Sequence, residues 1–429
     1  MIGFAVVSSS QNTGLACLYS DTFGSRFLPL RDIKPWLEDV VTKNYALVSL
    51  DSHKMYRSLL FLGPEFLEKI KVFDLRSYYH NVTGEKNVNM IKRGTELCKI
   101  DLDAEMTRIN RIWKIQRERD WEHIPMPIKQ VYLQKEATLA FEVGKLLSPI
   151  AKFSPSMREY MVFFQNFLIW LARIENTGLI SKEWDRVTPL YDYDSTATGR
   201  IINTEPFCYQ TKSIEKVIEP YRSRFEKGKI ILADWRNADF RVAAGLSKEI
   251  LLGERDDPYT LIAKKIYGKE QISDDERDEG KKRVLSIMYG YSPDDSNLFF
   301  NTYPKIARFK REITESASKT LKVESPFGKV RTFSKDAIFS TMALASLCQM
   351  TVADFCKKAI IETQKEFSAR GLESVPIPII RYDAFCFDIK PGEEKESAEA
   401  INKSLIDRTI PSHIQFFGNF DVKLTDIYT

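Results

Sequence analysis

The 429-residue sequence has little that would support disulfide or zinc chemistry. Its six cysteines are scattered and no two form a CxxC pair, and its four histidines lie too far apart for an HExxH helix. A chain of this size without paired cysteines is typical of a reduced, cytoplasmic protein. Any metal ion is therefore expected to be held by carboxylates.

Long apolar runs and an excess of one charge are also absent. The apolar stretch at residues 160–172 is interrupted by Gln165 and Asn166 and is too short to span a bilayer, and the start MIGFAVVSSS lacks the basic residues of a secretory signal, so we expect no membrane partner. Lys plus Arg number 63 against 59 Asp plus Glu, a net charge of +4. This balance excludes a histone-like polycation but still permits a local basic groove for nucleic acid.

Hydrophobic patterning predicts an α+β protein. Residues 4–8, 46–50 and 72–75 are typical of buried strands and residues 53–63 of a helix, which indicates an N-terminal α/β domain. Long helical patterns follow at 104–121 and 134–147. Strand patterns return at 227–235 and 375–390, separated by helical segments such as 273–290. We therefore expect a helical middle section and then a sheet interrupted by a large helical insertion.

Two aspartates stand at the ends of predicted strands. Asp234 closes the apolar run at 227–235, where a helix-capping residue is the ordinary interpretation. Asp383 lies between two apolar runs, where a hairpin-turn residue is the ordinary interpretation. Two strand-end carboxylates in one sheet are, however, also what a two-metal site needs, and Mg²⁺ prefers such oxygen ligands.

A four-residue repeat precedes Gly290. Arg277, Lys281, Leu285 and Tyr289 would form one stripe on a helix. An Arg and a Lys one turn apart suit a polyphosphate, and the aromatic residue beside a glycine suits stacking near a base or sugar. The spacing alone favours the alternative, which is a solvated basic helix face.

Together these segments resemble the motifs of the family A DNA polymerases, the group of bacterial DNA polymerase I and many phage enzymes. Motif A of the family resembles Asp234-Trp-Arg-Asn-Ala-Asp239-Phe-Arg241. The fingers-helix motif is similar to Arg277-xxx-Lys281-xxx-Leu285-xxx-Tyr289-Gly290, and motif C, usually His-Asp-Glu, resembles Tyr382-Asp383-Ala384. Four more segments match in collinear order: Thr198-Gly199-Arg200, Asp257-Pro-Tyr-Thr260, Pro326-Phe-Gly-Lys-Val-Arg331 and Gln349-Met-Thr-Val-Ala-Asp354. Seven motifs in order across residues 191–390 are hard to obtain by chance.

The resemblance implies primer-dependent, template-directed DNA synthesis, with primer–template DNA and dNTPs as partners and two Mg²⁺ ions, replaceable by Mn²⁺, as cofactors. The implied metal ligands are Asp234, Asp383 and the carbonyl of Trp235, and Lys281 is implied as a proton donor to the leaving pyrophosphate. The implied dNTP contacts are Arg277, Lys281, Leu285, Tyr289, Asp239 and Tyr259. The implied DNA contacts are Arg200, Gln349, Gly290 and Tyr382.

Several positions depart from the family pattern. The usual steric-gate Glu is Asp239, one methylene shorter, and the aromatic under the deoxyribose is Leu285. The Glu and His of motif C are Ala384 and Tyr382, and a His ahead of the fingers helix is Tyr259. We therefore expect a working but looser polymerase with lower discrimination against ribonucleotides.

The resemblance further implies a right-hand polymerase fold with an N-terminal, RNase H-like domain of the 3′–5′ exonuclease type. We expect the exonuclease-like domain at 1–98, a helical thumb-like region at 99–186, the palm at 187–246 and 336–429, and the fingers at 247–335. The first strand lacks the Asp-x-Glu pair of an exonuclease, although Asp51 and Asp74 remain, so we expect no proofreading. An unrelated α/β scaffold is the alternative.

The helical section carries a basic stripe. Arg108 and Arg111 belong to a three-residue repeat that could follow DNA phosphates, with a solvated helix face as the alternative. The section is short for a thumb of the family, which suggests a processivity or replisome accessory protein as a further partner. The compact length and the drift of the motifs suggest a phage-type member acting in the host cytoplasm.

Two other functions remain open. A single-subunit RNA polymerase or primase-like enzyme is favoured by Asp239 and Leu285, because an aliphatic residue at the latter position is typical of those RNA polymerases. A catalytically silent DNA-binding subunit would be expected to lose its metal carboxylates, yet Asp234 and Asp383 are both present.

Overall fold

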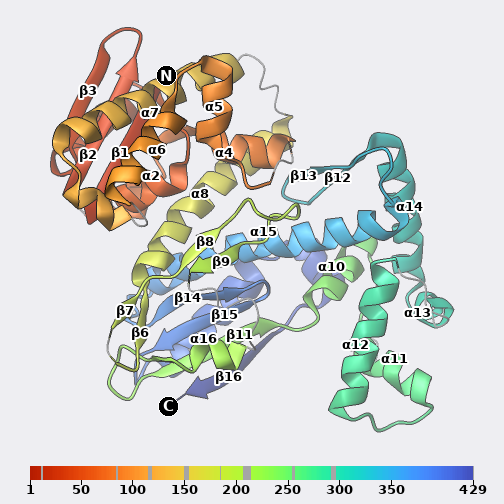
Figure 1. Cartoon of the computed structure of the whole chain (residues 1–429). Helices are drawn as coiled ribbons and strands as arrows, with labels where there is room; N and C mark the ends of the chain where they lie inside the picture. Colours follow the sequence, from red (N-terminus) through yellow and green to blue (C-terminus); the bar gives the residue numbers. More distant parts are fainter. Residues whose placement is uncertain are drawn as a thin grey trace. The chain divides into compact units, whose positions relative to one another are not determined.

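The computed structural model describes residues 1–10, 13–83, 86–114, 118–148, 154–183, 185–205, 214–253, 257–290 and 296–428. The chain forms two compact units, Met1–Asn176 and Thr177–Thr429 (Figure 1). Cys208 lies outside the described residues, and the other five cysteines are free thiols.

The N-terminal unit is built on a five-stranded mixed sheet with the order β3-β2-β1-β4-β5. The strands are β1 (Ile2–Ser10), β2 (Thr13–Ser20), β3 (Gly24–Pro29), β4 (Ala46–Ser49) and β5 (Lys71–Asp74). Strand β2 runs antiparallel to β1 and β3, whereas β4 is parallel to both β1 and β5. Residues 2–7 of β1 are all buried, which requires cover on both faces of the sheet.

Helices supply that cover. They are α1 (Lys34–Thr42), α2 (Ser52–Leu59), α3 (Pro64–Leu67), α4 (Leu75–Tyr78), α5 (Met90–Cys98), α6 (Leu102–Trp113), α7 (Met126–Leu147) and α8 (Pro155–Thr177). Helix α7 crosses β1 so closely that a Cβ on Gly3 would lie 2.0 Å from the carbonyl oxygen of Ala137, so only glycine fits there.

The core of this unit extends beyond residue 98, where we expected the first domain to end. Ala5 of β1 and Val48 of β4 share one buried cluster with Leu133 and Val143 of α7. Because the apolar face of α7 is covered by the sheet, α7 belongs to the same compact unit. The division between the two compact units falls at 176/177, and the predicted limits of the exonuclease-like and thumb-like regions stay predictions.

Asp51 and Asp74, the aspartates that the sequence analysis compared with an exonuclease site, both have structural partners in the N-terminal unit. Asp74 caps α4 by accepting a hydrogen bond from the backbone N of Ser77 at 2.8 Å, and it accepts another from the backbone N of Ser52 at 2.8 Å. Asp51 caps α2 and forms an ion pair with Arg76 at 2.9 Å. Both side chains therefore have a role in the fold as helix caps.

The second unit contains a four-stranded antiparallel sheet with the order β14-β15-β11-β16. Its strands are β11 (Lys229–Trp235), β14 (Val375–Arg381), β15 (Ala384–Ile389) and β16 (Val422–Tyr428). The other strands described in this unit form smaller sheets. One contains β6 (Leu179–Ser181), β7 (Arg186–Val187) and β10 (Tyr221–Arg222). Another pairs β8 (Leu190–Asp192) with β9 (Ile202–Glu205), and a further one pairs β12 (Lys322–Glu324) with β13 (Val330–Thr332).

The helices of this unit fall into two groups. Those near the sheet are α9 (Ile214–Ile218), α10 (Ala238–Ser247), α15 (Phe339–Ala369), α16 (Glu394–Asn402), the π-helix Lys403–Arg408 and α17 (Ser412–Gly418). Those of the predicted fingers are α11 (Pro258–Tyr267), α12 (Asp274–Met288), α13 (Ser296–Thr302) and α14 (Pro304–Thr320), which form a separate group beyond the end of α10 in Figure 1.

Helix α15 runs alongside the four-stranded sheet (Figure 1). Phe367 near its end stacks on Phe387 of β15 with ring centroids 5.7 Å apart.

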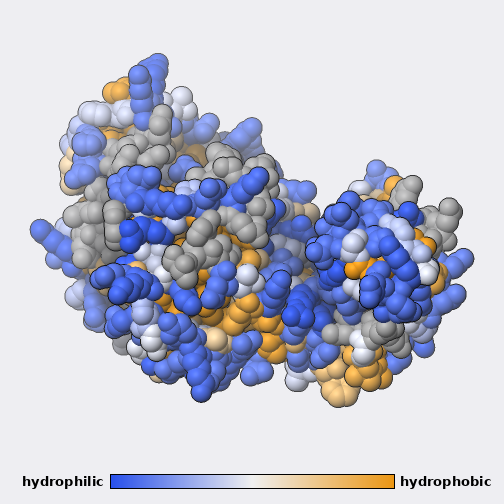
Figure 2. Space-filling model, turned by 90° about the horizontal axis from the view of Figure 1, so that it is seen from below, coloured by the Kyte–Doolittle hydropathy of each residue, from blue (hydrophilic) through white to orange (hydrophobic). Residues whose placement is uncertain are grey.

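Among the described residues α15 is the one helix long and apolar enough to cross a membrane by length and composition alone, but 67% of its most apolar window is buried inside the protein, as in a core helix. The face shown in Figure 2 is mainly hydrophilic.

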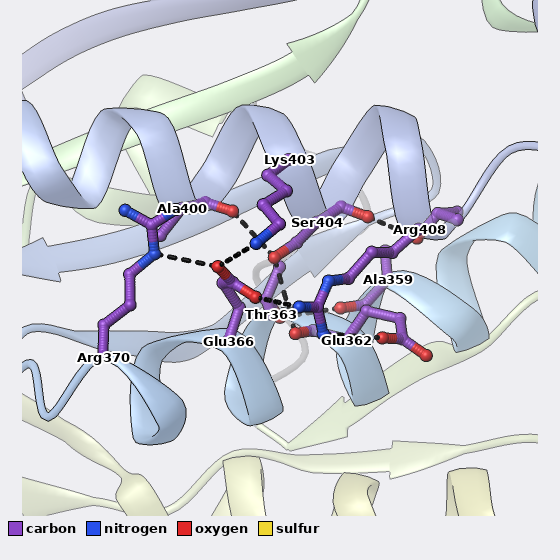
Figure 3. Close-up of polar contacts among 10 residues, drawn as sticks. Ala359, Glu362, Thr363, Glu366, Arg370, Ala400, Lys403, Ser404 and Arg408 are labelled. Atoms are coloured by element: carbon purple, nitrogen blue, oxygen red, sulfur yellow. Dashed lines mark hydrogen bonds and ion pairs between the residues drawn. The ribbon is translucent and has the colours of Figure 1, made fainter.

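A buried carboxylate on α15 binds cations of the π-helix that follows α16 (Figure 3). Glu366, whose side chain is 3% exposed, accepts hydrogen bonds from Arg370 Nε at 2.8 Å and Lys403 Nζ at 3.1 Å. It also pairs with Arg408 Nη2 at 2.6 Å. One carboxylate thus collects three cations from two segments of the chain.

Replacement of Glu366 by alanine is expected to lower the free energy of unfolding by about 2 kcal/mol, because three charge-assisted contacts lose their common acceptor. Glu399, 3.7 Å from Arg370 with its side chain 58% exposed, is the matched control. Its alanine variant should change stability by less than ~0.5 kcal/mol. Urea unfolding would measure both, and equal effects would contradict the anchoring role of Glu366.

Candidate active site

The two predicted metal-binding aspartates lie side by side at one end of the sheet. Asp234 is the penultimate residue of β11, and the last, Trp235, donates its N–H to the carbonyl of Asp383 at 3.2 Å. Asp383 occupies the tight turn between β14 and β15. Asp234 does not cap α10, whose N-cap residue is Asn237. The position of the Asp234 carboxylate is therefore set by the pairing of β11 within the sheet and not by a role as a helix cap.

A cavity of about 660 Å³ opens beside the two aspartates. The predicted site residues that line it are Asp234, Trp235, Asp239, Tyr259, Arg277, Lys281, Leu285, Tyr382 and Asp383. They come from β11, α10, α11, α12 and the β14–β15 turn, so segments more than a hundred residues apart meet here. The volume lies in the range of cavities that bind small-molecule ligands.

The electrostatics of the aspartate pair favour bound cations. Burial raises the pKa of Asp234 above its ordinary value against the opposing field of Lys281 and Lys423. Burial, together with repulsion from Asp234 and Asp239, also raises the pKa of Asp383. Divalent cations would relieve this crowding of negative charge.

The donor set fits magnesium better than zinc. Within the described ranges, no group of three or more His, Cys, Asp or Glu side chains is arranged to hold a metal ion. Mg²⁺ is typically bound through one or two carboxylates and completes its coordination with water and substrate phosphates. Asp234 and Asp383 provide that minimal set at the edge of the cavity.

Helix α12 carries the predicted cationic stripe. Its start is fixed by a capping box in which Ser273 Oγ accepts from the N–H of Glu276 at 3.4 Å and Glu276 Oε2 accepts from the N–H of Ser273 at 3.0 Å. Arg277 and Lys281 both lie over the ring of Tyr259, 5.4 and 5.9 Å from its centroid. The two cations therefore share a contact with Tyr259 and line the cavity, and Lys281 is also exposed to solvent.

Arg277 is held in place by an aspartate that caps the preceding helix. Its Nε and Nη2 donate to Asp257 Oδ2 and Oδ1 at 3.0 and 3.3 Å. Although burial opposes the effect, the hydrogen bonds from Arg277 and Thr260 lower the pKa of Asp257. The guanidinium thus has a fixed orientation at the mouth of the cavity, which Asp257 also lines.

Asp239, which stands where the family has its steric-gate Glu, has a partner that the sequence did not predict. The hydroxyl of Tyr382 donates to Asp239 Oδ1 at 2.5 Å. The guanidinium of Arg200 lies over the Tyr382 ring, 3.9 Å from its centroid. Burial raises the pKa of Asp239, and hydrogen bonds from Tyr382 and Tyr289 oppose that rise. Two predicted DNA contacts and one predicted dNTP contact thus form a single chain of interactions.

The end of α12 packs against α15. Gly290 has φ +98°, and a Cβ there would lie 2.4 Å from the Cα of Thr341, so this position requires glycine. The adjacent Tyr289 has a buried hydroxyl that faces Asp239 and Gln349. Tyr289, Gly290 and Gln349 therefore lie next to the site, although they are not among the residues lining the cavity.

Arg108 and Arg111 lie on α6 of the N-terminal unit and do not line this cavity. Arg108 forms an ion pair with Glu105, whose carboxylate also accepts from Lys135 at 3.0 Å. Arg111 is exposed on the same helix. Their role in DNA binding stays a prediction.

Lys423 is a cavity residue that sequence reasoning missed. It lies on β16 directly opposite Asp234 in the strand register. No motif lies near Lys423 in the sequence, and residues 422–428 were not predicted to form a strand of this sheet. Asp257 belongs to a segment that matches the family pattern, but its pairing with Arg277 is visible only in the structure.

Comparison with known proteins finds one family and several relatives. The model of DNA polymerase family A matches residues 172–424. DNA polymerase I of Borreliella burgdorferi is 23% identical over 462 residues, covering 94% of this chain and 50% of that protein. DNA polymerase I of Synechocystis is 28% identical over 133 residues, covering 28% of this chain and 14% of that protein. The chain thus spans half or less of the length of these relatives.

A solved structure shares the fold. The POL domain of Pol1 from M. smegmatis, in complex with DNA primer–template and dNTP, superposes with a TM-score of 0.67 at 13% identity. The match covers 99% of this chain and 95% of that chain.

Proposed function

Because the chain belongs to DNA polymerase family A, we propose that it carries out template-directed, primer-dependent DNA synthesis, transferring a nucleotidyl group from a dNTP to a primer 3′-hydroxyl. The observation that carries this proposal is the cavity that gathers Asp234, Asp383, Arg277 and Lys281. A pair of carboxylates facing two cations is the arrangement needed to bind a metal-complexed triphosphate.

Asp234 and Asp383, with the Trp235 carbonyl as a further donor, would hold two Mg²⁺ ions or Mn²⁺ in their place. Such ions activate the primer hydroxyl and neutralise charge on the leaving pyrophosphate. Arg277, whose Nε and Nη2 donate to Asp257, would contact the triphosphate through its remaining N–H groups. Lys281 would compensate the charge and donate a proton to the leaving group.

The remaining residues would position the nascent base pair. Tyr289 would stack at the pair and Tyr259 would support the two cations over its ring. Arg200, Gln349, Gly290 and Tyr382 would contact primer–template DNA in the minor groove, where acceptors occupy equivalent places for all correct pairs. Asp239 and Leu285 would face the sugar.

The N-terminal unit would be an RNase H-like domain of the exonuclease type that has lost its nuclease. Its mixed sheet and the structural pairing of Asp51 and Asp74 support this assignment. The helices within residues 99–186 would form a thumb that is short for the family, which supports a processivity or replisome accessory protein as partner. We further propose, from the drift of the motifs, a phage-type origin and action in the host cytoplasm.

Primer extension with Mg²⁺ would test the proposal. We expect elongation of a primer with dNTPs, no unprimed synthesis from rNTPs, and a dNTP over rNTP preference lower than the family shows, because Asp239 and Leu285 leave more room at the sugar. Unprimed RNA synthesis would instead support the RNA polymerase or primase-like alternative, which Leu285 in the cavity favours. A high preference for dNTPs would contradict the prediction of a loose sugar site.

Single-stranded DNA should not be degraded by this chain. Strand β1 carries no Asp or Glu, so Asp51 and Asp74 lack the first-strand carboxylates that an exonuclease needs for its metal ions, and both act as helix caps. The measurement is nuclease activity with Mg²⁺ or Mn²⁺. Degradation that disappears in Asp51→Ala or Asp74→Ala would overturn this prediction.

A further inference from the structure

Asp239 is held by a hydrogen bond from the opposite side of the cavity. Its Oδ1 accepts the hydroxyl of Tyr382 at 2.5 Å, a length typical of a strong O–H···O⁻ bond. The two side chains come from α10 and from the β14–β15 turn, and both line the cavity with Leu285. A carboxylate bonded in this way cannot rotate freely within the site.

Tyr382 is itself rigidly placed. Its backbone has φ +59°, an uncommon conformation for a bulky residue and one that concentrates at functional sites. The Arg200 guanidinium covers its ring at 3.9 Å. The backbone of the turn and the stacked cation together aim the phenol hydroxyl at Asp239.

From this arrangement we propose that Tyr382 is a positioning residue that fixes Asp239 and thereby sets discrimination between deoxyribose and ribose in the incoming nucleotide. The inference rests on the proposed polymerase function and assigns the specificity of the same site. A free aspartate could turn aside and accept a hydrogen bond from a ribose 2′-hydroxyl. The bonded aspartate keeps its place, and with Oδ1 already engaged it is less able to turn toward a 2′-hydroxyl and accept its hydrogen bond.

Two side chains thus compensate for each other. Asp239 is too short to act as the usual gate unaided, and the long phenol of Tyr382 reaches it across the site. Leu285 provides no aromatic ring on the sugar, so we expect this bonded pair to carry a larger share of the selectivity, with Tyr289 as a further neighbour of Asp239.

The test compares kcat/KM for one dNTP and the matching rNTP in single-nucleotide addition to a primer. Tyr382→Phe, which keeps the ring and removes the hydroxyl, should lower the dNTP preference by about tenfold. Tyr267→Phe, whose side chain is exposed in the fingers, is the matched control and should leave the preference unchanged. A preference that stays unchanged in Tyr382→Phe would overturn the inference, even if all rates fall, because a uniform loss cancels in the ratio.

A double variant separates an effect through Asp239 from a direct one. In the Asp239→Ala background, adding Tyr382→Phe should change the preference by less than about twofold, since the group that Tyr382 positions is gone. A full tenfold loss in that background would overturn the inference. If the wild-type chain extends no primer, both the proposed function and this inference fail. If Tyr382→Phe extends primers with the same dNTP over rNTP preference as wild type, only the inference fails.

Discussion

Asp234→Asn should lower the rate of primer extension by at least about 10³-fold, because one of the two carboxylates that would hold metal ions loses its charge. Binding of primer–template duplex should persist, since the predicted DNA contacts lie on other side chains. The backbone of Asp234 pairs with β15 on one side and β16 on the other, so the change leaves the strand in place.

The same substitution should not destabilise the fold. Asp383 already has a raised pKa because it is buried close to Asp234, and removing one charge relieves that repulsion. Asp407→Asn, an exposed carboxylate outside the cavity, is the control and should extend primers normally. Extension by Asp234→Asn within tenfold of wild type would remove this aspartate from the active site.

Lys281→Ala should lower kcat/KM for dNTPs by about 10²-fold. Its ammonium lies over the Tyr259 ring and its charge acts on Asp234, Asp239 and Asp383, so it stands where a triphosphate would meet the metal ligands. Loss of a positioned cation at developing negative charge typically costs this much.

The adjacent lysine offers a matched control. Lys282 is 77% exposed on the same helix and pairs only weakly with Glu279 at 3.8 Å. Lys282→Ala removes the same charge one residue away and should change kcat/KM by less than about threefold. Similar losses in the two variants would indicate a general effect of positive charge on DNA binding and would contradict the specific role of Lys281.

Local sequence patterns predicted the elements that carry the site. The strands at Asp234 and around Asp383, and the helix with Arg277 and Lys281, form as expected, because β-branched runs and a charged four-residue repeat specify them without distant contacts. The residues that line the cavity show that these segments meet in the fold, which the sequence around each segment cannot show by itself.

Features that depend on tertiary pairing were not predicted. Lys423 lies beside Asp234 only because β16 joins the edge of the sheet. The first unit extends past residue 98 because α7 finds its apolar cover on β1. The bond between Tyr382 and Asp239 joins residues that sequence comparison marked as two separate departures from the family pattern.

The most direct test of the central claim is whether the template dictates each addition. Single-nucleotide extension would be measured with each of the four dNTPs opposite each of the four template bases, in Mg²⁺. We expect addition of the complementary dNTP in every case, abolished in Asp234→Asn and retained in Asp407→Asn. Addition without regard to the template base, or no addition by the wild-type chain, would contradict the account.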